Sequence, residues 1–268
     1  MSIFCCPICG GPLDREPSAY SCPAGHSFDL AREGYVHLLP ANRMHSKMPG
    51  DDKGMAAARA AFLSKDYYAP LRDALCSIAL ERTGPAPRVL DTGCGEGYYS
   101  ARLAAAMGAP LTGLDISKEA VRCAAAKYKA CAWLCSTAAH IPVPDGSAGT
   151  LTSLFALTLP GEFRRVLREG GIFLQVLAAE DHLLGLKSII YEELTHKEKN
   201  ITPLLPGFEL LESQEIKFPF TVEGAQIGHL LSMTPHLFRI GKAGAQRLQE
   251  TQILCDTASC ILNIYRAI

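Results

Sequence analysis

The sequence contains no hydrophobic stretch long enough to cross a membrane. Its unbroken apolar runs, such as residues 172–174 and 176–179, fall far short of the roughly 20 residues that a bilayer-spanning helix needs. Residues 1–4 form too short an apolar segment for an export signal. We therefore expect a soluble, cytoplasmic protein that makes no contact with a membrane.

The sequence also lacks an excess of charge of either sign. Its 26 basic and 27 acidic residues give a net charge of −1 at pH 7. This balance argues against a protein dedicated to polyanions, and a hydrophobic content of 48% argues against disorder. With 268 residues, the chain can form one large domain or two ordinary ones around a sizeable core.

Disulfide bonds are not expected, although the chain has eleven cysteines. An odd number cannot pair completely, and without an export signal a reducing compartment is favoured. Four cysteines lie within the first 22 residues. The other seven stand in apolar contexts, where we expect them to pack as small hydrophobes: Cys76, Cys94, Cys123, Cys131, Cys135, Cys255 and Cys260.

The N-terminal cysteines form two short metal-binding patterns. Cys6 and Cys9 make the first pair and Cys22 and His26 the second, with glycines beside the ligands that permit tight turns. Four such ligands suit tetrahedral zinc, and a site closed by four protein ligands is structural. A redox CxxC or unrelated buried thiols are the alternatives, but no strand–helix unit precedes the motif. Cys5 would be spaced less well from Cys9, so Cys6 is the favoured ligand.

The composition suggests three parts. Residues 1–36 are predicted to form a zinc-binding module, 37–84 a connector with N-terminal helices, and 85–268 the catalytic domain. Within the connector, prolines and glycines interrupt the periodicity before a helix that is expected to begin near Asp51 or Asp52. The connector is locally basic, so it either contacts phosphate or is a solvated linker. Its basic residues are Arg43, His45, Lys47 and Lys53.

From residue 88 the sequence alternates between strand and helix patterns, which predicts an α/β fold with a doubly wound, mostly parallel sheet and helices on both faces. Ser117 is a suitable N-cap for one of the helices. The expected strands are 88–91, 111–115, 132–135, 150–155, 172–177, 209–218 and 259–265. The expected helices are 98–107, one that follows Ser117, 162–168, 183–194 and 225–233.

A glycine-rich turn follows the first of these strands. Gly93, Gly95 and Gly97 allow the backbone to pass close to a ligand at the carboxyl end of the sheet. The sixth position of a dinucleotide fingerprint needs glycine, and here it is Tyr98, so NAD is disfavoured. Asp115 ends the second strand twenty residues after Gly95, which suits hydrogen bonds to the hydroxyls of a ribose.

This acid-x-G-x-G-x-G turn, with a second strand that ends in Asp, resembles the cofactor motifs of class I S-adenosylmethionine-dependent methyltransferases. The zinc knuckles, residues 32–40, the stretch 49–68, the run 91–99 and Met233-Thr234-Pro235 together resemble the RlmA-type large-subunit rRNA (guanine-N1)-methyltransferases from end to end. The resemblance implies a Rossmann-like methyltransferase domain with an N-terminal zinc ribbon. It also implies methylation of guanine N1 in a hairpin loop of large-subunit rRNA, with S-adenosylmethionine as cofactor and structural zinc.

The resemblance assigns roles to particular residues. Cys6, Cys9, Cys22 and His26 correspond to zinc ligands. By their own context, Tyr68 is equally an aromatic anchor for the preceding helix and His182 a surface histidine. Ala138, after the third strand, is expected to hold adenine through its backbone, because Thr137 replaces the usual acid. The residues expected at the cofactor are Tyr68, Gly93, Gly95, Glu96, Gly97, Asp115, Ala138 and His182.

One departure from the family pattern concerns the acceptor. Residues 155–158 read Phe-Ala-Leu-Thr where the family has an aromatic residue followed by Ala-Pro, which leaves altered base selectivity or weaker activity open. The alternatives are a methyltransferase for another nucleobase or a small molecule, and a non-catalytic relative that binds RNA or the ribosome. The intact glycine loop and Asp115 argue against the latter. The sequence identifies neither the general base nor the target guanine, and it leaves both a monomer and a homodimer open.

Overall fold

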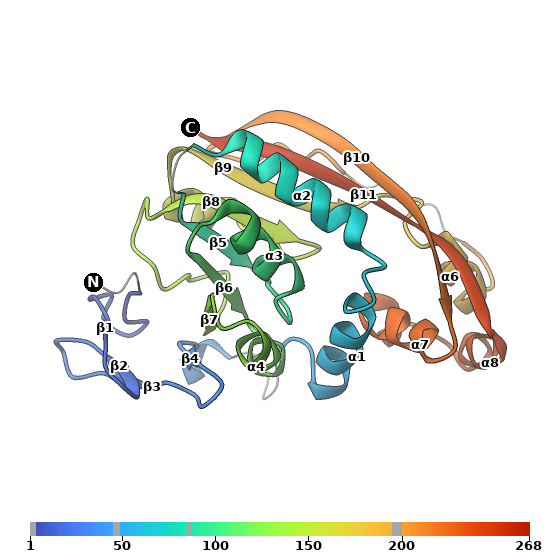
Figure 1. Cartoon of the computed structure of the whole chain (residues 1–268), viewed down its shortest axis with the longest axis horizontal. Helices are drawn as coiled ribbons and strands as arrows, with labels where there is room; N and C mark the ends of the chain where they lie inside the picture. The colour runs from blue at the N-terminus through green and yellow to red at the C-terminus, as the bar shows by residue number, and fades with distance from the viewer. Residues whose placement is uncertain (1–3, 45–48, 85–86, 195–199) are drawn as a thin grey trace.

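The computed structural model describes residues 4–44, 49–84, 87–194 and 200–268. Within these residues an eight-stranded sheet has the order β10-β11-β9-β8-β5-β6-β7-β4, and a separate three-stranded sheet has the order β1-β2-β3 (Figure 1). Strands β4 to β9 run parallel, and β11 is antiparallel to both of its neighbours, β9 and β10, as expected for the last strand. The strands are β1 Asp14–Arg15, β2 Ala19–Ser21, β3 Ser27–Asp29, β4 Tyr35–His37, β5 Val89–Thr92, β6 Leu111–Asp115, β7 Ala132–Cys135, β8 Ala148–Leu154, β9 Leu167–Ala178, β10 Phe208–Glu223 and β11 Ile253–Ala267.

Two of the described α-helices, α1 and α4, begin at residues whose side chains cap them. The Asp52 carboxylate accepts a hydrogen bond of 2.9 Å from the Met55 N–H and starts α1, and the Ser117 hydroxyl caps α4 in the same way. Gly108 ends α3 in a left-handed conformation, as predicted. The helices are α1 Lys53–Leu63, α2 Ala69–Arg82, α3 Tyr98–Met107, α4 Lys118–Lys127, α5 Pro160–Val166, α6 Leu184–Ile190, α7 Ala225–Ser232 and α8 Lys242–Glu250, with short 3-10 helices η1 Ala41–Arg43 and η2 Pro235–Phe238.

The predicted end of helix 162–168 and the predicted start of strand 172–177 are both wrong. Helix α5 ends at Val166, and β9 begins at once with Leu167. From the pair Ala148↔Leu167 to the pair Thr150↔Ile172, β8 moves on by two residues whereas β9 moves on by five. The extra residues of β9 therefore form a bulge. The bulge contains Gly170 and Gly171, which directly precede the expected strand.

The other differences lie in the second half of the chain. Strands β10 and β11 are much longer than expected, because they pair with each other along their whole length from Phe208↔Ala267 to Glu223↔Ile253. Helix α6 ends at Ile190, before the expected residue 194. Helix α8 was not expected from the sequence, because its exposed, polar composition gives no apolar stripe.

Buried side chains form a core on each face of the large sheet. Along β9, Leu174 faces the core beneath α2 and α3, whereas Phe173 faces the core beneath α5. Phe4 and Tyr20 of the N-terminal segment belong to this second core. The N-terminal segment therefore covers part of a face that was expected to carry helices alone.

Strand β4 connects the N-terminal segment to the large sheet directly. Tyr35 pairs with Trp133 and His37 with Cys135, so β4 is the parallel edge strand beside β7. This strand lies across the predicted boundary between residues 36 and 37. The three-part division remains a prediction, but the last residues of the proposed zinc module are structurally part of the sheet.

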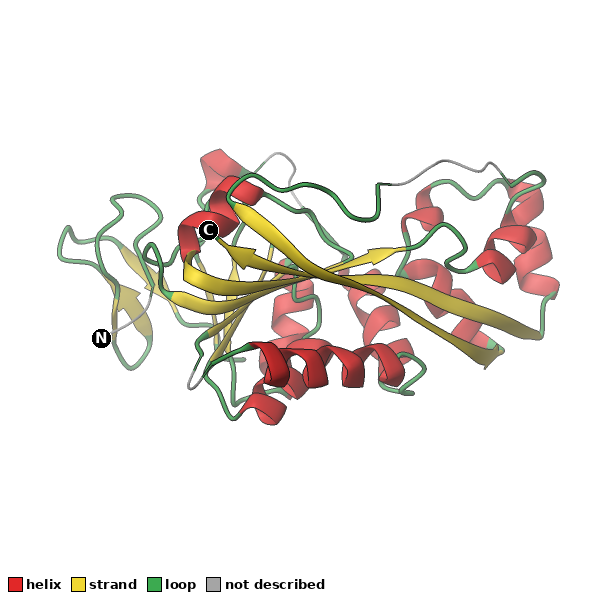
Figure 2. Ribbon diagram, turned by 90° about the horizontal axis from the view of Figure 1, so that it is seen from above, coloured by secondary structure: helices red, strands yellow, loops and turns green. Residues whose placement is uncertain are grey.

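The long β10–β11 ladder extends past the other strands and carries α7, η2 and α8 at its far end (Figure 2). Helix α7 packs against α1, and α8 packs against α6. The connection between β10 and β11 thus returns to the carboxyl end of the parallel strands (Figure 1). Within the residues that the structure describes, no helix is both long enough and apolar enough to cross a membrane.

Candidate functional site

A cavity of about 430 Å³ lies at the carboxyl end of β5, where an open α/β sheet usually binds its ligand. The glycine loop forms one wall, the end of β8 a second, and α1 with the segment that follows α7 a third. The lining residues are Gly50, Asp51, Met55, Arg59, Leu63, Asp91, Gly93, Cys94, Gly95, Glu96, Tyr98, Tyr99, Asp115, Leu154, Phe155, Ala156, Met233, Thr234, Pro235 and Phe238.

The glycine loop has a backbone that other residues adopt poorly. Gly95 has a φ of 55° and Gly97 a φ of 86°, both in the left-handed region. A Cβ atom on Gly97 would also lie 2.6 Å from the Trp133 side chain. Gly95 faces the cavity, and its nearest neighbour is the Arg59 side chain. The loop therefore brings bare backbone to the cavity wall, as the sequence predicted.

The Asp115 carboxylate holds the loop in place. One oxygen accepts a bond of 2.9 Å from the Gly95 N–H, and the other accepts a bond of 2.8 Å from the Ser117 N–H. Burial raises the pKa of Asp115 above its ordinary value, and the two amide donors oppose this effect. Because each carboxylate oxygen has a second lone pair, Asp115 can still accept bonds from a ligand in the cavity.

The other two acids of the loop are more deeply buried. Hydrogen bonds from the Ser100 and Thr152 hydroxyls occupy both oxygens of Asp91, and burial raises its pKa to about 6. Glu96 is 5% exposed and accepts a bond of 2.8 Å from the Tyr98 N–H. Burial raises the pKa of Glu96 to about 7. Together with Asp115, the cavity therefore contains three carboxyl groups that ionise less readily than exposed ones.

Sequence reasoning did not assign a role to the polar residues above the loop. The Arg59 guanidinium lies 2.9 Å from the Asp51 carboxylate and donates to the Met233 carbonyl at 3.4 Å. The Ser117 hydroxyl donates to the Asp51 carbonyl at 2.5 Å. These contacts fix α1 and the segment after α7 over the cavity. The only signal for them was that residues 49–68 and Met233-Thr234-Pro235 belong to the family resemblance.

Tyr68 and His182 come together, although 114 positions separate them in the chain. The Tyr68 hydroxyl lies 3.5 Å from His182 Nε2, and Nδ1 of that ring lies 2.9 Å from the Ser259 carbonyl oxygen. Tyr68 is 1% exposed and packs edge-on against Phe218. Among the described residues, the cavity lining includes neither of this pair nor Ala138. Their role at the cofactor therefore remains a prediction, and the packing of Tyr68 also suits the alternative of an aromatic anchor.

The four predicted zinc ligands form a cluster in which all ligand atoms lie within 4.8 Å of one another. His26 Nδ1 is 3.5 Å from Cys6 Sγ and 3.3 Å from Cys22 Sγ, which is 3.7 Å from Cys9 Sγ. Tetrahedral zinc–sulfur bonds of about 2.3 Å separate two sulfur atoms by about 3.8 Å, so the donor set fits zinc. Cys5 lies outside the cluster. Cys6, rather than Cys5, therefore stands with the other three predicted ligands, and its role as a zinc ligand stays a prediction.

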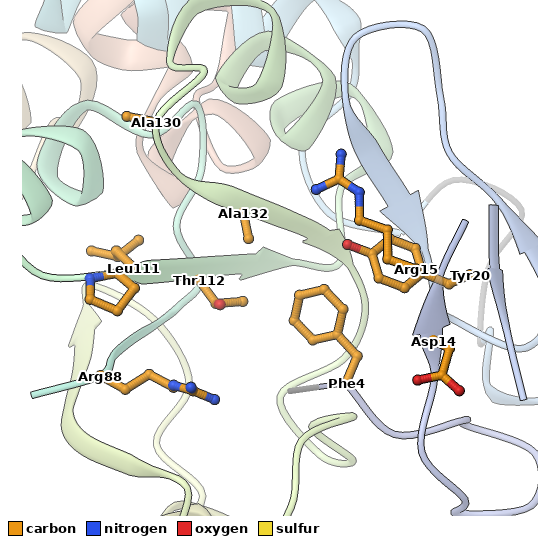
Figure 3. A pocket seen from close by; sticks show the side chains of 10 residues that line it. Phe4, Asp14, Arg15, Tyr20, Arg88, Leu111, Thr112, Ala130 and Ala132 are labelled. Carbon is orange, nitrogen blue, oxygen red and sulfur yellow. The ribbon is translucent and has the colours of Figure 1, made fainter. Parts of the chain in front are cut away.

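A second hollow of about 550 Å³ separates the N-terminal segment from the amino ends of β5, β6 and β7. Figure 3 shows the Phe4 ring between Arg88 on one side and Arg15 with Tyr20 on the other. Asp14 lies at its margin. The hollow is at the opposite end of the strands from the glycine loop, so it is a separate surface with two guanidinium groups and two aromatic rings.

Metal content should follow the ligand cluster. Replacing Cys6 with Ala removes one of four ligands, and we expect zinc to fall from about one atom per chain to well below half of that. Cys5→Ala is the matched control and should keep its zinc. Elemental analysis of both purified variants makes the measurement. Loss of zinc from Cys5→Ala together with retention in Cys6→Ala would contradict the ligand set.

Stability should decrease as Glu96 ionises. Burial raises the folded-state pKa from 4.5 to about 7, so the folded chain holds this proton more tightly than the unfolded chain does. From pH 4 to pH 8, the wild-type protein should therefore lose about 3 kcal/mol of unfolding free energy relative to Glu96→Gln. Urea titrations across this range test the prediction, with the exposed Glu223→Gln as control. Parallel pH profiles for wild type and Glu96→Gln would refute it.

Two family profiles match the chain. The profile described as RlmA, N-terminal, matches residues 4–47, and a methyltransferase domain matches residues 89–171. A solved structure from Anaeromyxobacter dehalogenans, provisionally assigned as a type II methyltransferase, is 20% identical with a TM-score of 0.50 and covers 72% of this chain and 94% of its own. That likeness supports the expected methyltransferase fold.

Relatives with higher identity extend over most of the chain. The 23S rRNA (guanine(748)-N(1))-methyltransferase of Streptomyces fradiae is 35% identical over 237 residues, which cover 86% of this chain and 84% of that protein. A protein of Micromonospora griseorubida, provisionally assigned as a 23S rRNA (guanine-N1)-methyltransferase, is 38% identical over 201 residues, which cover 68% of this chain and 67% of its own. The chain therefore belongs to the family of 23S rRNA (guanine-N1)-methyltransferases.

Proposed function

We propose that this protein transfers a methyl group from S-adenosylmethionine to N1 of a guanine in a hairpin loop of large-subunit rRNA, in the cytoplasm. The observation that carries the proposal is the combination, in one chain, of a complete zinc cluster with a cofactor cavity lined by the glycine loop and Asp115. The Streptomyces fradiae relative, which is named as a 23S rRNA (guanine-N1)-methyltransferase, is similar over 86% of this chain.

The geometry of the cavity supports the cofactor positions that we propose from the sequence. The exposed backbone at Gly95 allows close approach, and the remaining lone pairs of Asp115 suit the two hydroxyls of a ribose. The proposed binding site also includes Tyr68, Glu96 and His182 on the basis of the family resemblance, Gly93 and Gly97 as members of the glycine loop, and Ala138 as the expected adenine position. When bound, S-adenosylmethionine supplies a methyl group that its sulfonium already activates.

The protein then has to align the acceptor and exclude water, rather than provide covalent catalysis. Leu63 and Leu154 give the cavity an apolar lining, and Arg59 closes it from above through its contacts with Asp51 and Met233. Neutral guanine carries a proton on N1, so a proton acceptor must lie close to that atom during transfer.

The RNA is proposed to contact the N-terminal segment as well as the cavity. Arg15 and Arg88 flank the second hollow, where Phe4 and Tyr20 supply aromatic edges. Lys53 is exposed at the start of α1, at the end of the basic connector. His45 and Lys47 of that connector lie outside the described residues. Such cations can bind phosphates without an overall positive charge on the chain.

A different acceptor is the second candidate function. Leu157, which replaces the proline of the family pattern, is 69% exposed in the loop after β8. A changed loop at this position favours another nucleobase or a small molecule as acceptor. Product identification separates the two candidates. The homodimer, which the sequence left open, is tested by sedimentation of the purified protein.

Asp115 should be required for cofactor affinity. Asp115→Ala removes two charge-assisted hydrogen bonds to the ribose, each worth roughly 1.5–3 kcal/mol, so S-adenosylmethionine should bind at least about tenfold more weakly. Calorimetric titration gives the affinity, and circular dichroism verifies that the variant is folded. Asp14→Ala, which removes an exposed carboxylate outside the cavity, should bind as the wild type does. Unchanged affinity in Asp115→Ala would exclude the ribose assignment.

The product should be N1-methylguanosine. Purified protein and S-adenosylmethionine are incubated with in vitro transcribed 23S rRNA, and nuclease digestion with mass spectrometry locates the methyl group. RNA binding should weaken as salt rises, and the salt slope should fall by about one for Arg15→Ala. The full chain is used because deletion of the N-terminal segment would also remove β4 from the sheet. Methylation at any other atom would overturn the proposed acceptor.

A further inference from the structure

Two large aromatic side chains are exposed to solvent at the cofactor cavity. Phe155, directly after β8, is 42% exposed, and Phe238, at the end of η2, is 76% exposed. Both line the same cavity, although positions 155 and 238 lie 83 residues apart in the chain. An apolar ring that stays in water forgoes the stabilisation that burial would give, so the exposure of two rings at one cavity suggests a ligand.

The backbone at Phe155 is strained. Its φ is 54°, which is in the left-handed region and rare for a bulky residue. Such a conformation persists only where neighbouring contacts enforce it, and it is common at binding sites. Here the Phe155 N–H donates to the Val176 carbonyl at 2.9 Å, and the Gln175 amide donates to the Thr158 hydroxyl at 2.8 Å. The loop is thus fixed at both ends by β9.

Phe238 is also held at a defined position. The Thr234 hydroxyl accepts a bond of 3.3 Å from the His236 N–H and caps η2. His236 Nδ1 lies 2.8 Å from the Tyr191 hydroxyl, which joins η2 to the end of α6. Arg59 holds the Met233 carbonyl from α1. The two rings therefore lie on elements that are anchored independently of each other.

Strand order separates Phe155 from the ribose end of the proposed cofactor site. The order β8-β5-β6-β7 places Asp115, at the end of β6, on one side of the glycine loop, which follows β5. Phe155 follows β8, on the other side of that loop. Ala138, the proposed adenine position, follows β7 and is farther still from β8. Phe155 consequently lies on the side of the cavity that is away from the nucleoside, and Phe238 lines the same cavity from η2.

We propose that Phe155 and Phe238 form the acceptor subsite, in which the rings contact the faces of the base to be methylated. This inference rests on the proposed function, and it names the residues that receive the substrate. Stacking on an aromatic ring suits a planar base that has been unstacked from an RNA loop. The acidic groups of the glycine loop stay on the cofactor side.

The test uses full-length protein, in vitro transcribed 23S rRNA and two ring deletions. Phe155→Gly removes the ring and also relieves the backbone strain, since glycine adopts a left-handed φ freely, so this variant should fold. Phe238→Ala removes a ring that is already mostly in solvent. Each should lower kcat/KM for the RNA at least tenfold while changing the affinity for S-adenosylmethionine less than twofold. Phe155→Tyr, which keeps the ring, should restore kcat/KM to within about threefold of wild type.

Leu204→Ala is the matched control, because Leu204 is 91% exposed and is not part of the cavity lining. It should leave every measured quantity unchanged. Wild-type kcat/KM in both ring deletions would overturn the inference. Weaker cofactor binding with unchanged kinetics toward RNA would also overturn it, since the rings would then belong to the cofactor site.

A salt series separates failure of this inference from failure of the proposed function. Stacking is not ionic, so the ring deletions should weaken RNA binding equally at all salt concentrations without changing the slope. If the wild-type protein methylates another atom or leaves the RNA unmodified, the proposed function fails. The affinity of the two ring-deletion variants for the RNA then still tests whether the rings contact a base. Binding equal to wild type across the series would then reject the subsite.

Discussion

A single carboxylate, that of Asp115, connects the segments on which the cofactor cavity depends. It lies at the end of β6 and binds the amides of Gly95 in the glycine loop and Ser117 at the start of α4. Ser117 in turn donates to the backbone of Asp51, just before α1. A buried carboxylate without these donors would strongly destabilise the fold. The Asp115 side chain therefore depends on the amides of the glycine loop and of the start of α4, and both segments are held in place by its two oxygens. The position of α1 over the cavity follows from the same chain of contacts.

Much of the central fold could be predicted from the sequence, because its signals are local. Helix α3 and strands β6 and β7 have the predicted bounds, since the glycine loop, Gly108 and the apolar runs mark each end. The bulge in β9 could not be predicted, because Gly170 and Gly171 read equally well as a turn before a strand. The full length of β10 and β11 depends on pairing with each other, which no local pattern reveals.

The candidate sites divide in the same way. The four residues of the zinc cluster could be predicted because two pairs of ligands at short spacing are typical of a zinc site. The glycine loop could be predicted because its left-handed backbone requires glycine. Arg59 and Phe238 could not be identified, since an arginine on a helix and a phenylalanine in a connection have many ordinary uses. Their positions at the cavity arise from tertiary contact with residues that are distant in sequence.

The pairing of β4 with β7 gives zinc a role beyond the ribbon itself. His26 precedes β4 by only nine positions, so the metal that holds His26 also restrains the segment that covers the edge of the large sheet. An uncovered β7 would present a row of unpaired amides and carbonyls, which is a template for pairing with another chain. Zinc bound by this cluster would therefore help to keep the edge of β7 covered, which is a role at the sheet edge and not at the cavity beside the glycine loop.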